Sequence, residues 1–281
     1  MIRGDSWRAS SLAARSLRRH TRCSGRHRAG LLTAAVALSL TACSGADDNQ
    51  TDDSQGSGEQ GTLTVFAASS LTQTFTTLEK AFEDEREGVD VVVSFDSSTS
   101  LAEQIKQGAP ADVIATADQA SMQTVVDADQ LSAEPVPFAS NTLAVVAPPD
   151  NPADIQSLGD LETADFVQCD PSAPCGAASK QLLEAAHITA QAKSLEPNVA
   201  AVLSKVTLGE ADAGLVYVTD ARAAGDEVAT INIPTAINVV NPYYIATVEG
   251  SPEPALADEW LALVSSQAGQ GVLQEAGFGA P

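Results

Sequence analysis

From residue 62 onward, the chain alternates short apolar runs, rich in β-branched residues, with segments whose apolar residues recur at helical spacing. The first three apolar runs are residues 63–68, 89–95 and 112–117, and each is followed by a helical segment. Strands that alternate with helices in this way are typical of a parallel sheet with helices on both faces. The sequence therefore predicts an α/β fold in which the carboxyl ends of several strands meet at one edge.

The same alternation resumes further along the chain and predicts a second domain. Its expected strands are residues 143–147, 165–169 and 213–218, and its expected helices are residues 177–186 and 198–206. Two closing helices, at residues 255–265 and 267–276, are expected to pack on the first domain. The predicted division is residues 62–141 plus 237–281 for domain I and residues 142–236 for domain II. Two crossings form a hinge, and a ligand is expected in the cleft between the domains.

The first 42 residues have the features of an export signal. Residues 3–28 contain eight arginines and one acidic residue, Asp5, and an apolar run follows at residues 31–40. This order is typical of a signal peptide, and the apolar run is too short to span a bilayer. The sequence LTAC that ends at Cys43 is similar to the lipobox of bacterial lipoproteins. We therefore expect removal of residues 1–42 and a lipid on Cys43; the alternative is ordinary secretion with a free Cys43.

Residues 43–61 are polar, acidic and rich in glycine and serine, so we expect a flexible tether. The whole chain has a net charge of −22; removal of residues 1–42 leaves seven basic and 36 acidic residues, a net charge of −29. Such an acidic surface repels nucleic acid and anionic lipid, so nucleic acid is not an expected partner. The expected location is the outer face of the cell membrane, where the lipid on Cys43 would anchor a monomer.

Two cysteines remain in the folded part, Cys169 and Cys175. In an exported protein, two cysteines at this short separation favour a disulfide. The alternative is a pair of metal ligands, but no histidine or third cysteine lies nearby to complete a tetrahedral site.

Three polar turns precede predicted helices: Ala-Ser-Ser at residues 68–70, Asp-Ser-Ser at 96–98 and Ala-Pro-Cys-Gly at 173–176. Free backbone N–H groups and the positive end of the helix dipole make such turns suitable for anions. Ser70 with Gln73, and Ser100 with Glu103, also match the capping-box pattern, so the alternative for Ser70 is that it only caps its helix.

Several motifs, taken in order, resemble the molybdate-binding proteins of bacterial ABC importers. They are VFAASSL, VVVSFDSSTSLAEQIKQGAPADVIATAD, NTLAVVAP, DPSAPCG and GEADAGLVYVTDA, and the resemblance covers residues 62–281. It implies the type II periplasmic-binding-protein fold, in which two α/β lobes with parallel-rich sheets close on a tetrahedral oxyanion. It further implies molybdate or tungstate as the ligand, no cofactor, and a membrane permease with its ATPase as the partner.

The resemblance also implies a set of oxyanion-binding residues. The hydroxyl donors would be Ser70, Ser98 and Tyr217, and the backbone N–H donors would be Cys175 and Val199. Cys175 departs from the family pattern, which usually has a small residue there. A backbone donor survives a change of side chain, so this departure leaves the implied role of Cys175 in place.

The remaining basic residues lie outside the three turns. They are Lys80, Arg86, Lys106, Lys180, Lys193, Lys205 and Arg222. A dianion would therefore be held by N–H and O–H dipoles without a counter-cation. Because the turns are expected to supply donors and no carboxylate, phosphate, which keeps a proton near pH 7, should bind at least about tenfold more weakly than molybdate. The expected order is molybdate close to tungstate, then sulfate, then phosphate.

Other functions stay open from the sequence. An enzyme, such as a hydrolase, is disfavoured because His187 is the one histidine after the predicted signal, and no GxSxG, HExxH or P-loop motif occurs. A receptor for another solute, such as sulfate or an organic acid, would share the same fold. A purely adhesive surface lipoprotein would need no closing cleft.

Overall fold

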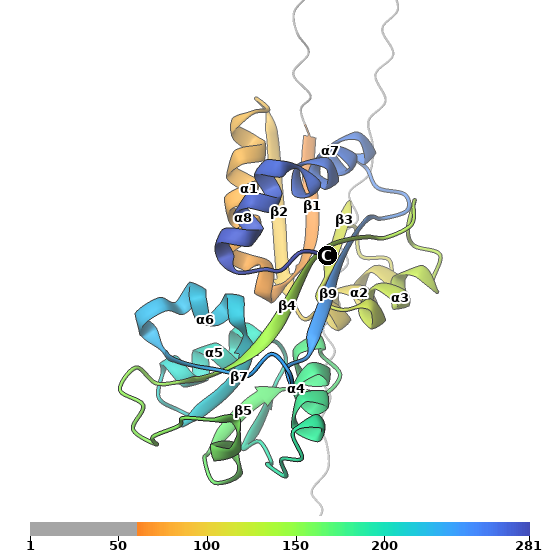
Figure 1. The fold of residues 1–281 in the computed structure, drawn as a ribbon. Coiled ribbons are helices and arrows are strands. Elements are labelled where there is room, and N and C mark those ends of the chain that lie inside the picture. Colours follow the sequence, from red (N-terminus) through yellow and green to blue (C-terminus); the bar gives the residue numbers. More distant parts are fainter. Residues whose placement is uncertain (1–60) are drawn as a thin grey trace, which may run out of the picture. The chain divides into compact units, whose positions relative to one another are not determined.

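The computed structural model describes residues 61–281. The predicted signal peptide, Cys43 and nearly all of the predicted tether lie outside the described residues. Within the described part, strands and helices alternate as predicted (Figure 1). None of the helices in this part combines the length and apolar character needed to cross a membrane.

The first part of the chain forms three strand–helix pairs at one end of the sheet. They are β1 (Gly61–Ala68), α1 (Thr72–Asp84), β2 (Val89–Asp96), α2 (Ser98–Lys106), β3 (Val113–Thr116) and α3 (Gln119–Val126). A short 3-10 helix, Ser69–Leu71, joins β1 to α1. Because β1 pairs in parallel with both β2 and β3, the carboxyl ends of the three strands lie at the same edge.

The middle of the chain forms a second group with the same design. It contains β5 (Phe166–Cys169), α4 (Pro174–Ala185), β6 (Ser194–Glu196), α5 (Val199–Thr207), β7 (Ala213–Tyr217), α6 (Val218–Ala224) and β8 (Ala229–Asn232). Short 3-10 helices cover Leu158–Glu162 and Gly225–Glu227. Strand β5 pairs in parallel with β6 and β7. Helix α4 begins earlier than the predicted residue 177, because proline is favourable at the first position of a helix.

Two antiparallel strands, β4 (Val136–Ala147) and β9 (Val240–Thr247), join the two groups. The strand order is β2-β1-β3-β9-β4-β7-β5-β6, with β8 also on β4. The sheet is therefore mixed: each group is parallel inside, whereas every pairing of β4 is antiparallel. The predicted strand start at residue 143 was wrong, because the polar and proline-containing first half of β4 is recruited by pairing with β9.

The buried apolar residues form separate clusters in the two groups, which we call lobe I and lobe II. The cluster of lobe II lies around β4, β5 and β7 and includes Leu143, Phe166 and Leu215. Lobe I has one cluster on each face of its strands, with Phe75 in one and Met122 in the other. Both lobes belong to one compact unit, so the domain boundaries predicted from sequence stay a prediction.

The closing helices, α7 (Pro254–Ser265) and α8 (Gln267–Ala276), lie beside α1 in lobe I (Figure 1). Trp260 of α7 is fully buried and makes edge-to-face contacts with Phe75 and Phe82 of α1, with ring centroids 5.5 Å apart in both cases. Aromatic pairs in this geometry stabilise beyond the area they bury. These contacts hold the closing helices against lobe I.

Candidate functional site

A narrow cavity of about 10 Å³ lies between the lobes. Its wall includes all five residues predicted to bind an oxyanion, namely Ser70, Ser98, Cys175, Val199 and Tyr217. A cavity needs roughly 10–15 Å³ on this measure to hold one water molecule, so this one is closed to about that size. Its walls must move apart before a larger solute can enter. The structure brings the five residues together, while their role in binding stays a prediction.

Three helices point their N termini at this cavity. Helix α2 begins at Ser98, α4 at Pro174 and α5 at Val199, and all three residues line the wall. The N–H groups of a first helical turn have no partner inside the helix, and the helix dipole makes this end positive. Because Pro174 has no N–H, Cys175 carries the first N–H of α4. The geometry favours an anion at the point where the three helices meet.

The capping boxes predicted for α1 and α2 were wrong. Helix α1 has Leu71 at its N-cap, and the hydroxyl of Ser70 instead bonds Tyr243 Oη at 2.8 Å. Helix α2 begins at Ser98, two residues before the predicted Ser100, with Ser97 at its N-cap and no side-chain cap. The Ser70 hydroxyl is thus engaged by a tertiary partner, whereas Ser100 lies inside the first turn of α2 and not at its N-cap.

Each of the three hydroxyls predicted to bind an oxyanion has a hydrogen-bond partner in the protein. Ser98 Oγ accepts a hydrogen bond from the backbone N–H of Ala117 at 2.9 Å. Tyr217 Oη accepts one from Asn241 Nδ2 at 2.8 Å. Burial raises the pKa of Tyr217 well above its ordinary value, so this phenol keeps its proton at neutral pH.

Ser97 contributes a further hydroxyl that sequence analysis did not assign. It lines the cavity, is 4% exposed, and its Oγ has no hydrogen-bond partner among residues 61–281. A buried hydroxyl without a partner costs roughly 1–3 kcal/mol, so such groups are rare unless something else satisfies them. A bound acceptor in the cavity would supply the missing partner.

One carboxylate also lies in the wall, contrary to the expectation that the turns supply none. Asp96 lines the cavity, and its Oδ1 accepts hydrogen bonds from Ser97 N at 2.7 Å and from Asn198 Nδ2 at 2.9 Å. Sequence reasoning missed it because an Asp before two serines was taken for a turn residue. None of the basic residues of the described chain lines the cavity.

Two hydrogen bonds join the lobes near the end of β2. One is the bond from Asn198 of lobe II to Asp96 of lobe I. The other runs from Thr99 Oγ1 to the carbonyl oxygen of Ser172, at 2.7 Å. Both start or end at the turn after β2, so this turn connects the lobes on one side of the cavity.

The predicted disulfide between Cys169 and Cys175 is present. Among residues 61–281 no cluster of three or more potential metal ligands occurs, so nothing favours the alternative of a metal pair there. The bridge joins the end of β5 to the first turn of α4. It thereby limits where the Cys175 N–H can move relative to the sheet.

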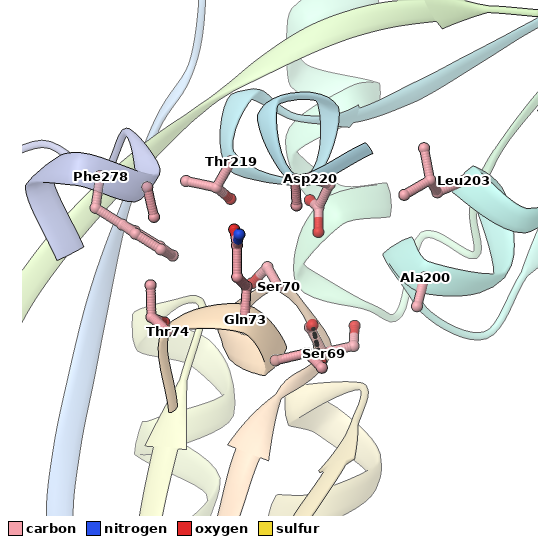
Figure 2. Close-up of a pocket in the computed structure, with 12 residues that line it drawn as sticks. Ser69, Ser70, Gln73, Thr74, Ala200, Leu203, Thr219, Asp220 and Phe278 are labelled. Atoms are coloured by element: carbon pink, nitrogen blue, oxygen red, sulfur yellow. Dashed lines mark hydrogen bonds between the residues drawn. The ribbon is translucent and has the colours of Figure 1, made fainter. Parts of the chain in front are cut away.

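A larger hollow of about 370 Å³ adjoins the cavity and shares Ser69 and Ser70 with it. Figure 2 shows Asp220 of α6 pointing toward the turn that holds these serines. Asp220 is 8% exposed, and burial raises its pKa to about 7 although the Tyr217 N–H bonds its Oδ2. This carboxyl therefore changes charge near neutral pH.

Three residues behind the wall escaped sequence analysis, namely Asn141, Asn241 and Tyr243. All are at least 93% buried and lie on β4 and β9, which place them next to the hydroxyls of the wall. No local motif marks them. The one available signal was a polar residue inside a predicted strand, which needs a partner when buried.

The comparisons with known proteins agree with this geometry. The profile of the family described as bacterial extracellular solute-binding protein matches residues 63–279. The chain is 40% identical over 256 residues to the molybdate-binding protein ModA of Mycobacterium tuberculosis, covering 90% of this chain and 97% of the relative. It is 36% identical over 207 residues to the molybdate-binding protein ModA of Escherichia coli, covering 68% and 79%.

Solved structures show the same architecture. The periplasmic molybdate-binding protein of Azotobacter vinelandii matches with a TM-score of 0.68 and 20% identity, covering 78% of this chain and 99% of that chain. The sulfate-binding protein SubI of Mycobacterium tuberculosis also matches with a TM-score of 0.68, at 18% identity over 77% of this chain and 86% of that chain. The predicted α/β fold of the type II periplasmic binding proteins is confirmed.

Proposed function

Because the chain belongs to the bacterial extracellular solute-binding proteins, we propose that it captures molybdate outside the cytoplasm and delivers it to an ABC permease with its ATPase. Tungstate, which has nearly the same size and charge, would bind as well. The observation that carries the proposal is the cavity itself, whose wall combines three helix N termini with hydroxyl groups and no basic side chain. The role is binding and release, without catalysis.

Neutral donors are sufficient for such a ligand. A hydrogen bond to an ionised group contributes roughly 1.5–3 kcal/mol, so several of them outweigh the cost of association. The donors that we assign are the hydroxyls of Ser70, Ser98 and Tyr217 and the N–H groups of Cys175 and Val199. The acidic surface opposes binding only weakly, because charges beyond about 8 Å are screened at physiological salt.

Calorimetric titration tests the proposal. We expect the protein to bind molybdate and tungstate alike and sulfate more weakly, since a smaller anion leaves the donors at longer distances. Ser98→Ala should weaken molybdate binding by about 1–3 kcal/mol because it removes one charge-assisted donor. Ser100→Ala is the matched control, since Ser100 is exposed in the same helix and does not line the cavity.

Two results would reject parts of this proposal. Tight sulfate binding without molybdate binding would assign the protein to another solute. Equal molybdate affinity of Ser98→Ala and Ser100→Ala would mean that the ligand lies elsewhere.

We further propose that a lipid on Cys43 holds the protein at the outer face of the cell membrane as a monomer, with residues 43–61 as the tether. The support is the LTAC sequence that ends at Cys43, after a basic and an apolar segment. Cys43→Ser should move the protein from the membrane fraction to the soluble exported fraction. A variant that stays with the membranes as wild type does would contradict lipid attachment at this residue.

A further inference from the structure

Three hydroxyls that face the cavity, those of Ser70, Ser98 and Tyr217, each have a protein partner whose own chemistry decides which way the hydroxyl proton points. A hydroxyl can donate one hydrogen bond and accept two. If the protein already donates to it, its own proton is left for another acceptor. Whether the protein donates or accepts at each hydroxyl therefore decides what the cavity offers to a ligand.

At Tyr217, the second hydrogen bond of Asn241 decides which partner donates in the bond between the two residues. The amide nitrogen of Asn241 is 2.8 Å from Tyr217 Oη and 3.2 Å from the carbonyl oxygen of Ala117. A carbonyl oxygen only accepts, so it requires the NH₂ group of Asn241 on its side, and an amide NH₂ only donates. Tyr217 must then accept from Asn241, and its proton is left for the cavity.

At Ser70 the direction is relayed through Tyr243 from Asn141. The backbone N–H of Thr142 bonds Asn141 Oδ1 at 2.9 Å, which turns Nδ2 toward Thr219 Oγ1 at 2.8 Å and Tyr243 Oη at 3.4 Å. Tyr243 Oη lies 2.8 Å from Ser70 Oγ, and its buried proton needs an acceptor, so we infer that Tyr243 donates to Ser70. Burial raises the pKa of Tyr243 far above its ordinary value, so it keeps the proton that it donates. The proton of Ser70 is left for the cavity.

At Ser98 the direction is set by the backbone. The Ala117 N–H can only donate, so Ser98 Oγ accepts and its proton is also free to point into the cavity. The three hydroxyls are therefore oriented alike. Asn141 and Asn241, which orient two of them, are partners in the β4–β9 ladder and do not line the cavity themselves.

We propose that Asn241 and Asn141 are positioning residues for anion selectivity, because they hold the hydroxyls of Tyr217 and Ser70 as donors toward the cavity. A hydroxyl held in this way bonds an oxyanion oxygen that carries no proton, and it does not pair with the proton of hydrogen phosphate. Asp96 also lies in the wall, where two N–H groups bond its Oδ1. This inference rests on the proposed function of oxyanion capture.

A double-mutant cycle tests the inference for Asn241. Asn241→Asp replaces the donating amide by an acceptor of the same shape, so Tyr217 turns its proton away from the cavity. Tyr217→Phe removes the same proton outright. We expect each single variant to weaken molybdate binding at least about tenfold, the minimum for one lost charge-assisted bond. The loss caused by Asn241→Asp should be at least about tenfold smaller in the Tyr217→Phe background, because no proton is left to redirect.

The double-mutant cycle distinguishes a change in the orientation of the Tyr217 hydroxyl from the effect of the added charge and from unfolding of the variant. The added negative charge weakens binding equally in both backgrounds, so equal losses in the two backgrounds would overturn the inference. Wild-type protein that fails to bind molybdate would instead reject the proposed function. If Asn241→Asp does not fold, as judged by its thermal unfolding transition, the cycle of Asn141→Asp with Ser70→Ala tests the same idea for the other asparagine.

Selectivity gives an independent measurement. With its proton turned to the new carboxylate, Tyr217 presents a lone pair that can accept from hydrogen phosphate. The ratio of molybdate affinity to inorganic phosphate affinity at pH 7.5 should therefore fall further in Asn241→Asp than in Tyr217→Phe. A merely structural role of Asn241 would weaken both anions in proportion and leave the ratio at its wild-type value, which would contradict the inference.

Discussion

A Gly176→Ala variant is expected to lose roughly 3 kcal/mol or more of its free energy of unfolding and to bind molybdate more weakly. Gly176 follows Cys175 in the first turn of α4, and a Cβ built on it would overlap the carbonyl oxygen of Asp170 and lie 2.7 Å from that of Cys169. Both obstacles are backbone atoms, and the disulfide ties the same loop. The methyl group can fit only if the first turn of α4 moves, together with the N–H of Cys175.

Urea denaturation and molybdate titration of the same preparations would measure both effects. Gly271→Ala is the matched control, because Gly271 lies inside α8 and a Cβ there meets nothing within 4 Å. In a helix this change stabilises by about 0.5–1 kcal/mol. Gly176→Ala with the stability and affinity of Gly271→Ala would show that the turn is free to shift and does not place the donor.

The second large effect concerns pH. We expect the wild-type protein to lose about 2–4 kcal/mol more stability between pH 4 and pH 8 than Asp220→Asn does. Burial raises the pKa of Asp220 from 3.8 to about 7 in the folded protein. The folded state therefore holds this proton more tightly than the unfolded state does. The stabilisation is fully present below pH 3.8 and is lost as the pH rises through about 7.

Chemical denaturation across this pH range measures the difference. Three pKa units correspond to roughly 4 kcal/mol at most, and water in the adjoining hollow reduces this value. Asp220→Asn keeps an oxygen that accepts from the Tyr217 N–H. Asp226→Asn is the control, since Asp226 is exposed in the 3-10 helix that follows α6. Parallel stability curves for wild type and Asp220→Asn would mean that Asp220 is ionised at little cost.

Much of the fold could be predicted because it is determined locally. Apolar runs and helical spacing gave the alternation of strands and helices, and the closing helix Gln267–Ala276 was predicted to the residue. The disulfide followed from two cysteines in an exported chain. The first half of β4 could not be predicted, because Ser140 and Asn141 gain their strand conformation from long-range pairing, with β9 and, for Ser140, also with Gly279.

Part of the candidate site could likewise be predicted from the sequence, and part could not. The resemblance named Ser70 and Ser98, and the structure places both in one cavity wall. The capping role given to Ser70 failed because Tyr243, far away in sequence, bonds its hydroxyl at 2.8 Å. Asp96 was overlooked for the same reason, since only Asn198 of the other lobe shows that it faces the cavity rather than solvent.

The pairing of Asn141 with Asn241 has a mechanical consequence. These residues face each other in the ladder of β4 and β9, the strands that join lobe I to lobe II. Any rotation of one lobe against the other must bend these strands, and points near a rotation axis travel least. If the lobes rotate about β4 and β9, the two asparagines would therefore keep their place, and the protons they orient would already be set when an anion arrives. Little of the binding energy would then be spent on ordering the wall.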